Sequence, residues 1–142
     1  MRLVDTNVLL HAVNADSGEH AIARACLEEG LSSAAGLGFA WLALVGFVRL
    51  ATRRGILAQP LAMDDALAVV DDWLAAPQAQ VLEATPHHWP VLRRLLVGAG
   101  MAGNLSNDAH LAALAIEHGA TLVSFDRDFE RFAGLRFELL RA

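Results

Sequence analysis

The chain alternates short apolar runs with longer stretches of helical periodicity, and this alternation limits the folds open to it. Runs of this kind, rich in leucine, valine and phenylalanine, predict short buried strands at residues 3–4, 80–83, 121–125 and 135–140. Strands that are separated by helices pair in parallel and form a layered α/β fold. The sequence therefore predicts an α/β protein in which helices flank a parallel sheet.

Helix starts and stops can be placed between these strands. Apolar spacing, capping residues and the positions of glycine and proline predict helices at residues 7–13, 17–29, 39–52, 63–74, 85–98 and 107–118, with a short turn at 129–132. Ser17 and Thr85 are the expected N-caps of two of them, and Pro86 suits a first helical position. Trp41, Trp73 and Trp89 lie among aliphatic residues on these helices, so we expect all three in the core.

The composition describes a folded protein with an acidic balance. The chain has 142 residues, of which 55% are hydrophobic, and we expect residues 1–142 to form one domain. The net charge of −5 argues against a broad, non-specific affinity for nucleic acid. A local basic groove remains compatible with it. All eleven basic residues are arginine, whose planar guanidinium suits bidentate phosphate contacts.

Several features bear on the compartment. Cys26 is the single cysteine and cannot form an internal disulfide, and only two apolar residues separate Arg2 from Asp5, unlike a signal peptide. Residues 30–48 carry no charge and approach the length of a membrane span. Their glycines and the arginines that follow favour a buried strand and a buried helix instead. We expect a cytoplasmic protein with no membrane association.

Four aspartates follow apolar runs or open a helix at three distant places, namely Asp5, Asp108, Asp126 and Asp128. The carboxyl ends of parallel strands line one crevice in an open α/β sheet, which brings such residues together. Carboxylate oxygens are the ligands that hard divalent cations prefer. Thr6, Asn7 and Ser124 flank these aspartates, and Asn104 lies four residues before Asp108, so we expect them to support the same site.

Each aspartate taken alone also suits a capping role. Asp5, Asp126 and Asp128 each precede a helical segment, and Asp108 lies at the positive end of a helix macrodipole. Only their joint placement indicates a metal site, where a divalent ion would relieve repulsion between like charges. The six histidines have no spacing typical of zinc ligands.

Three segments of the chain carry the aspartates and their polar neighbours. They are VDTNVLL at residues 4–10, GNL at 103–105 followed by DAHLAALA at 108–115, and LVSFDRDF at 122–129. Together they resemble the PIN-domain ribonucleases of the VapC toxin type. The resemblance covers the whole chain, and each motif is modest until all three are seen in order. It implies a compact three-layer α/β fold with a central parallel sheet flanked by helices.

The resemblance also implies an activity and a set of partners. It implies an Mg²⁺- or Mn²⁺-dependent endoribonuclease toxin of a type II toxin–antitoxin system, often a homodimer, that hydrolyses RNA, inhibits translation or growth, and is inhibited by a VapB-type antitoxin. Asp5, Asp108 and Asp126 match the family's acidic metal site, with Asp128 as an additional ligand. Thr6, Asn7 and Ser124 match its polar supporting residues. Arg49, Arg53 and Arg127 are candidate contacts to the RNA backbone.

One position departs from the family pattern. Gly46 stands where many relatives have a glutamate, which leaves one anionic ligand fewer. Water, Asp128 or Asn104 would have to fill the gap. The alternative function is therefore a catalytically weakened PIN-like protein that binds RNA or its antitoxin. A phosphoacceptor receiver domain needs a lysine that this chain lacks, and a HAD-type phosphatase needs an aspartate where Asn7 stands.

Overall fold

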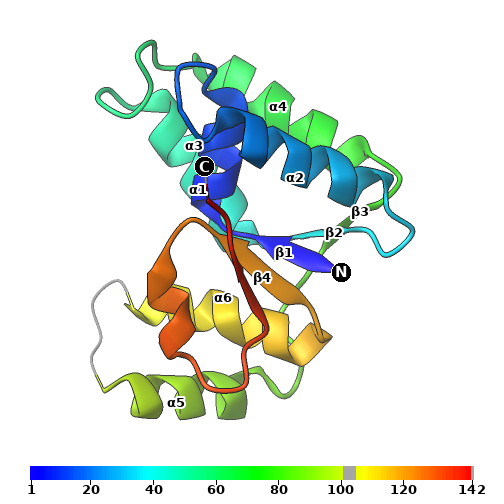
Figure 1. The fold of residues 1–142 in the computed structure, drawn as a ribbon, viewed down its shortest axis with the longest axis vertical. Helices are drawn as coiled ribbons and strands as arrows, with labels where there is room; N and C mark the ends of the chain where they lie inside the picture. The colour runs from blue at the N-terminus through cyan, green and yellow to red at the C-terminus, as the bar shows by residue number, and fades with distance from the viewer. Residues whose placement is uncertain (101–104, 142) are drawn as a thin grey trace.

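A five-stranded parallel sheet forms the centre of the protein (Figure 1). The computed structural model describes residues 1–100 and 105–141. The strands are β1 (Arg2–Val4), β2 (Leu37–Phe39), β3 (Ala79–Val81), β4 (Thr121–Ser124) and β5 (Phe137–Leu139), in the order β3-β2-β1-β4-β5. In the register of the two central pairs, Leu3 lies beside Gly38 of β2 and Leu122 of β4. The prediction of an α/β fold with a parallel sheet is confirmed.

Helices cover both faces of this sheet, so the fold has three layers (Figure 1). One face carries α1 (Thr6–Val13), α2 (His20–Ser32), α3 (Trp41–Thr52) and α4 (Met63–Ala75), and the other carries α5 (His88–Ala99) and α6 (Leu105–His118). A short 3₁₀ helix, η1 (Arg127–Arg131), follows β4. Within the described residues, no helix has the length and hydropathy needed to cross a membrane.

Three predicted helix starts were wrong. Ser17 does not cap α2, which begins at His20 and has Glu19 at its N-cap position. Phe39 belongs to β2, which is fully buried and pairs with β1 and β3, and α3 begins two residues later at Trp41. A short apolar run does not distinguish a buried strand from a buried helix, which explains the error. Thr85 does not cap α5, which begins at His88. The Thr85 hydroxyl instead accepts a hydrogen bond from the His87 N–H and donates one to Glu117.

The tryptophans divide between core and surface. Trp73 packs on the rings of Phe39 and Phe47, with centroids 6.2 and 4.9 Å away. The prediction that Trp41 and Trp89 are core residues was wrong, because their side chains are 50% and 63% exposed. Cys26 is buried and unpaired in the structure.

A buried carboxylate joins α6 to the start of α5. The Glu117 side chain accepts hydrogen bonds from the backbone N–H of Thr85 at 2.9 Å and its hydroxyl at 2.6 Å, and it pairs with His88 Nδ1 at 2.5 Å. These contacts hold the pKa of Glu117 below its usual value despite its burial. The other ring nitrogen of His88 lies 2.9 Å from His110 Nδ1. This network fixes the position of α6, the helix whose first turn carries Asp108.

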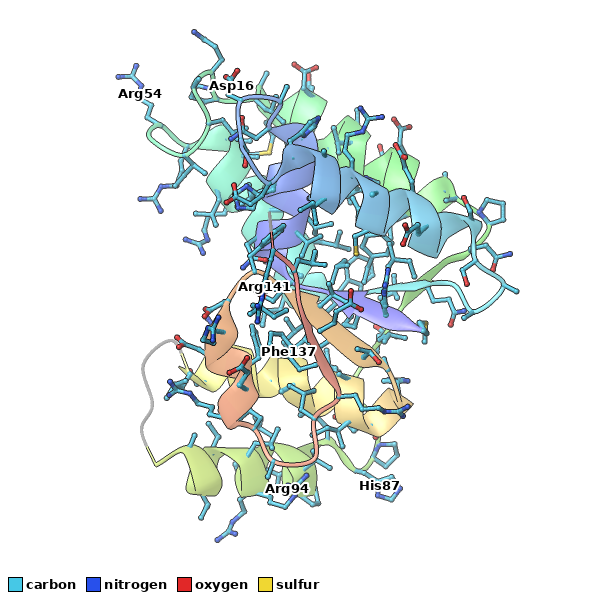
Figure 2. The ribbon with its side chains drawn as sticks, viewed as in Figure 1. Asp16, Arg54, His87, Arg94, Phe137 and Arg141 are labelled. Carbon is cyan, nitrogen blue, oxygen red and sulfur yellow. The ribbon has the colours of Figure 1, made fainter. Side chains whose placement is uncertain are left out.

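The last strand closes the sheet beside η1 and α5. Figure 2 shows Phe137 on β5 and Arg94 on α5. The Phe137 ring packs on Phe129 of η1 with centroids 5.7 Å apart, and Arg94 donates to the carbonyl of Ala133 at 3.2 Å. The segment that follows β4 is therefore anchored on both sides, which fixes the position of Asp126 at its start.

Candidate active site

The hydroxyl of Ser124 is the centre of a hydrogen-bond network at the carboxyl ends of β1 and β4. Ser124 is fully buried. Its hydroxyl donates to Asp5 Oδ2 at 2.7 Å and accepts from Asn7 Nδ2 at 3.0 Å and from the backbone N–H of Asp126 at 2.9 Å. The two strands are direct parallel neighbours, which places residues 119 positions apart in contact. Ser124 and Asn7 lie where the sequence placed them, beside the aspartates.

Asp5 serves as a helix cap and faces the site at the same time. One carboxylate oxygen accepts from the Thr6 N–H at 2.8 Å and caps α1, while the other accepts from Ser124. Burial raises the pKa of Asp5, the two hydrogen bonds oppose that rise, and the charge of Asp126 adds to it. Capping and chemistry are therefore compatible roles for this side chain.

Asp108 lies across from Asp5 in the first turn of α6. Its pKa is raised to about 6, mainly by burial and then by the charges of Asp5, Asp126 and Asp128. Arg131 acts in the opposite direction. The charges of the other three aspartates that the sequence singled out therefore act on Asp108.

Asp126 and Asp128 occupy different environments. Asp126 follows β4 and caps η1 by accepting from the Asp128 N–H at 2.9 Å. The Asp128 side chain is 59% exposed and lies 3.6 Å from the Arg131 guanidinium. Arg131 was not among the predicted site residues, because its place opposite Asp128 depends on the short helix between them.

The donor set fits a divalent cation in its chemistry. Asp5, Asp108 and Asp126 supply only carboxylate oxygens, the preferred ligands of Mg²⁺ and Mn²⁺. Burial and then the charges of Asp5, Asp126 and Asp128 raise the pKa of Asp108, and a bound cation would favour its ionised form. Across the described part of the chain, no three acidic, histidine or cysteine groups are already close enough to hold one ion. Binding would therefore draw the carboxylates inward.

Gly46 leaves a hollow beside these carboxylates. A Cβ atom at this position would lie 2.9 Å from Thr6 Oγ1, a distance that requires the threonine to move. Thr6 itself donates from Oγ1 to the carbonyl of Ala43 at 3.1 Å, so it fastens α1 to α3 rather than contacting Asp5 with its hydroxyl. The cavity in front of Gly46 has a volume of about 160 Å³, and both Asp5 and Asp108 line it.

The remaining predicted site residues lie farther out. Arg49 lines the hollow, and Arg53 and Arg127 are exposed at the end of α3 and in η1. Arg54, next to Arg53, extends away from the body of the protein (Figure 2). Asn104 lies outside the described residues. Asn107, which also lines the hollow, was not predicted from the sequence, because its role there depends on how α6 faces α3.

Comparison with known proteins gives the family. The PIN domain pattern matches residues 2–135. The chain is a PIN-domain protein of the VapC group. It is 49% identical over 138 residues to Ribonuclease VapC37 of Mycobacterium tuberculosis, covering 97% of this chain and 96% of that one. It is 42% identical over 137 residues to VapC ribonuclease Mb2897 of Mycobacterium bovis, covering 96% and 93% of the two chains.

Solved structures share the fold of this PIN domain. VapBC2 from Rickettsia felis, bound to a promoter DNA fragment, matches with a TM-score of 0.71 and 19% identity over 97% of both chains. The Mycobacterium tuberculosis toxin VapC20, described as cleaving the sarcin-ricin loop, matches with a TM-score of 0.69 and 21% identity over 96% of this chain and 99% of that one. The predicted PIN-like fold is confirmed.

The contact between Gly46 and Thr6 gives a first prediction. Gly46→Ala should destabilise the protein by about 1–3 kcal/mol, because its methyl group crowds Thr6 Oγ1. Thr6→Ala should cost about 1 kcal/mol through its lost hydrogen bond to Ala43. The double variant should cost clearly less than the sum, as measured by urea denaturation. Additive costs would contradict a direct contact, and Gly18→Ala, which meets no atom within 4 Å, is the control.

The pKa of Asp108 gives a second prediction, for protein kept in a chelator. The folded-state pKa lies above the ordinary value of 3.8, so the folded protein binds the extra proton and its stability falls as pH rises from about 4 to about 6. Asp108→Asn removes this cost. After allowing for solvent screening, we expect it to raise the melting temperature at pH 7.5 by roughly 3 °C and by less near pH 4.5.

The control for that experiment is Asp16→Asn, an exposed aspartate in the loop between α1 and α2. It should leave the melting temperature unchanged at both pH values in calorimetry. A lower melting temperature for Asp108→Asn at pH 7.5 would show that Asp108 stabilises the metal-free protein, contrary to the expected sign.

Proposed function

We propose that this PIN domain is a metal-dependent endoribonuclease, the toxin of a type II toxin–antitoxin pair that inhibits translation or growth. The observation that carries the proposal is the grouping of Asp5, Asp108 and Asp126 at the carboxyl edge of the sheet, where the charges of Asp5 and Asp126 act on Asp108 and the buried Ser124 hydroxyl bonds the Asp5 carboxylate and the Asp126 backbone. Ribonuclease names among relatives at up to 49% identity support the same activity. The geometry accounts for how the reacting groups would be held.

Asp5, Asp108 and Asp126 would hold the metal, and Mg²⁺ or Mn²⁺ fits their oxygen donors. When bound, such an ion stabilises charge on phosphate oxygens and lowers the pKa of water. Ser124 positions two of the three aspartates, since its hydroxyl contacts the Asp5 carboxylate and the Asp126 backbone. Asn7 holds Ser124 in turn, and Thr6 fixes the start of α1. Asp128 would join the ligands only by leaving Arg131.

The substrate would approach along exposed arginines. Arg49 lies on α3, Arg53 directly follows the last residue of that helix, and Arg127 lies in η1. Guanidinium groups suit bidentate contacts to phosphate, so Arg53 and Arg127 would hold the RNA backbone, while Arg49 lines the hollow beside the aspartates. The negative net charge of the chain makes this local arrangement more important.

The second candidate function is a PIN-like protein that binds RNA or its antitoxin with weakened catalysis. Gly46 favours it, because the chain has no carboxylate at that position and its hollow remains open. Cleavage assays distinguish this candidate from the nuclease, since both bind RNA and only the nuclease hydrolyses it.

Partners follow from the surface and from the related structures. Several solved structures with the same fold are VapBC complexes, which supports a VapB-type antitoxin as partner.

Trp41 and Val45 lie one turn apart on α3 and are 50% and 63% exposed. Neighbouring large apolar side chains that are exposed to solvent often mark a protein–protein interface. We propose that this pair forms part of a homodimer interface.

The third prediction concerns catalysis. Cleavage of single-stranded RNA should require Mg²⁺ or Mn²⁺ and stop in a chelator. Asp5→Asn and Asp126→Asn should lower the rate by more than roughly 100-fold, and Ser124→Ala by roughly 10- to 100-fold, the range for groups that orient metal ligands. Asp16→Asn is the matched control and should cleave normally. Chelator-resistant cleavage, or full activity of Asp5→Asn, would refute the metal-dependent mechanism.

The fourth prediction concerns the homodimer. Light scattering after size-exclusion chromatography should give the mass of a dimer for the natural protein and of a monomer for Val45→Glu, since a buried unpaired charge is costly. Val97→Glu is the matched control, because Val97 on α5 is 68% exposed and lies on the opposite layer. A monomeric natural protein, or a dimer that survives Val45→Glu, would exclude this interface.

A further inference from the structure

The hollow in front of Gly46 is shaped by three helices and opens beside the carboxylates. Its volume is about 160 Å³, and α1, α3 and α6 each contribute to its walls. An apolar cavity of about 150 Å³ admits a benzene molecule in another protein, so this hollow would take one ring of a base, and the second ring of a purine would lie at its exposed side beside Arg49 and Asn107. Besides the two aspartates, its walls include the polar Thr6, Arg49 and Asn107 and the apolar Leu42, Leu50 and Leu111.

Two of the polar groups are free to bind a ligand. Arg49 and Asn107 are exposed, and within the described residues neither side chain makes a hydrogen bond or an ion pair. They reach the hollow from different helices, α3 and α6. Thr6 is different, since its hydroxyl already donates to Ala43. The free donors of the hollow are therefore a guanidinium and an amide.

We propose that this hollow is a base pocket that takes a guanine next to the scissile phosphate, an inference that rests on the proposed ribonuclease function. Leucine side chains would contact the face of the ring, and Arg49 would donate to O6 and N7 on its edge, the pairing that a guanidinium fork makes with guanine. Asn107 would contact the same edge from α6. Proteins that recognise single-stranded RNA by sequence bind unstacked bases in this way.

The charge of the hollow favours a base over a second phosphate. Asp5 and Asp108 form part of its wall, so a phosphate placed in the hollow would add a third negative charge. Repulsion among these charges opposes that arrangement wherever the metal does not screen it. A neutral base avoids it, and its neighbouring phosphate would lie toward the carboxylates where the metal binds. Because both aspartates line the hollow, the recognised base belongs to a nucleotide that flanks the cut.

Gly46 is what leaves this space open. A Cβ atom here would lie 2.9 Å from Thr6 Oγ1, so a longer side chain would have to displace Thr6 or extend into the hollow that both residues line. Leu42, Arg49 and Leu50 lie on the same side of α3 as Gly46, within about 60° of it at 100° per residue. The glycine therefore determines specificity in this proposal by making room, and Arg49 and Asn107 recognise the base.

The test maps cleavage sites in a random-sequence RNA pool with the full chain and Mn²⁺. The natural protein should prefer guanine at one position flanking the cut. Arg49→Gln and Asn107→Ala should each reduce that preference, relative to other bases, by about 5- to 100-fold. Arg53→Gln is the matched control, because Arg53 is also an exposed arginine of the α3 terminus but does not line the hollow. It should leave the base preference as it is.

Three outcomes would overturn the base pocket while leaving the nuclease intact. They are cleavage without preference at either flanking position, a preference for a different base, and a uniform loss for Arg49→Gln at all sequences, which is the signature of a phosphate contact.

A second measurement covers the case in which no RNA is cut. Binding of trinucleotides that differ only in one base is then compared in a chelator by fluorescence anisotropy. Tighter binding of the guanine-containing trinucleotide, lost in Arg49→Gln, would support the pocket although the proposed catalysis had failed. Equal binding of all four would overturn the pocket as well.

Discussion

The parallel pairing of β1 with β4 is the contact on which the rest of the site depends. It brings the end of the first strand beside the end of the fourth, and the buried Ser124 hydroxyl then bridges Asp5, Asn7 and the Asp126 backbone. A hydroxyl can donate one hydrogen bond and accept two, and all three are used here. Neither aspartate can move without disturbing this centre. The protein thus holds like charges in place with a neutral group, which costs less than burying a counter-charge.

The same residues stabilise local structure and carry the chemistry. Asp5 caps α1 with one oxygen and faces Ser124 with the other, and Asp126 caps η1. Capping fixes the direction of each carboxylate, because the helix that follows is anchored in the core. Asp108 has no comparable restraint among the described contacts, and its pKa is raised to about 6. Its destabilising charge is the part of the site that a bound cation would most directly relieve.

Much of this could be predicted from the sequence because it depends on local pattern. Strand and helix periodicity predicted the layered parallel fold. The positions at and just after the ends of the first and fourth strands predicted Asp5, Ser124 and Asp126 as site residues. Features that depend on how distant helices face each other could not be predicted. Asn107 and Arg131 lie at the site through the placement of α6 and η1. Likewise, helical spacing could not show that Trp41 is half exposed to solvent. Its neighbours in the sequence are aliphatic, but they do not cover its ring in the folded protein.

Gly46 links the charge of the site to its shape. A carboxylate on α3 at this position would add a fourth anionic group near Asp5 and Asp108, and it would also occupy the hollow that they line. The glycine removes that repulsion and opens that space in one step. Thr6 then approaches α3 closely enough to bond Ala43, so the region that faces the missing side chain remains ordered. A chain with glutamate here gains an oxygen ligand and loses the hollow. The two arrangements exclude each other, because a glutamate that supplied the ligand would also fill the hollow.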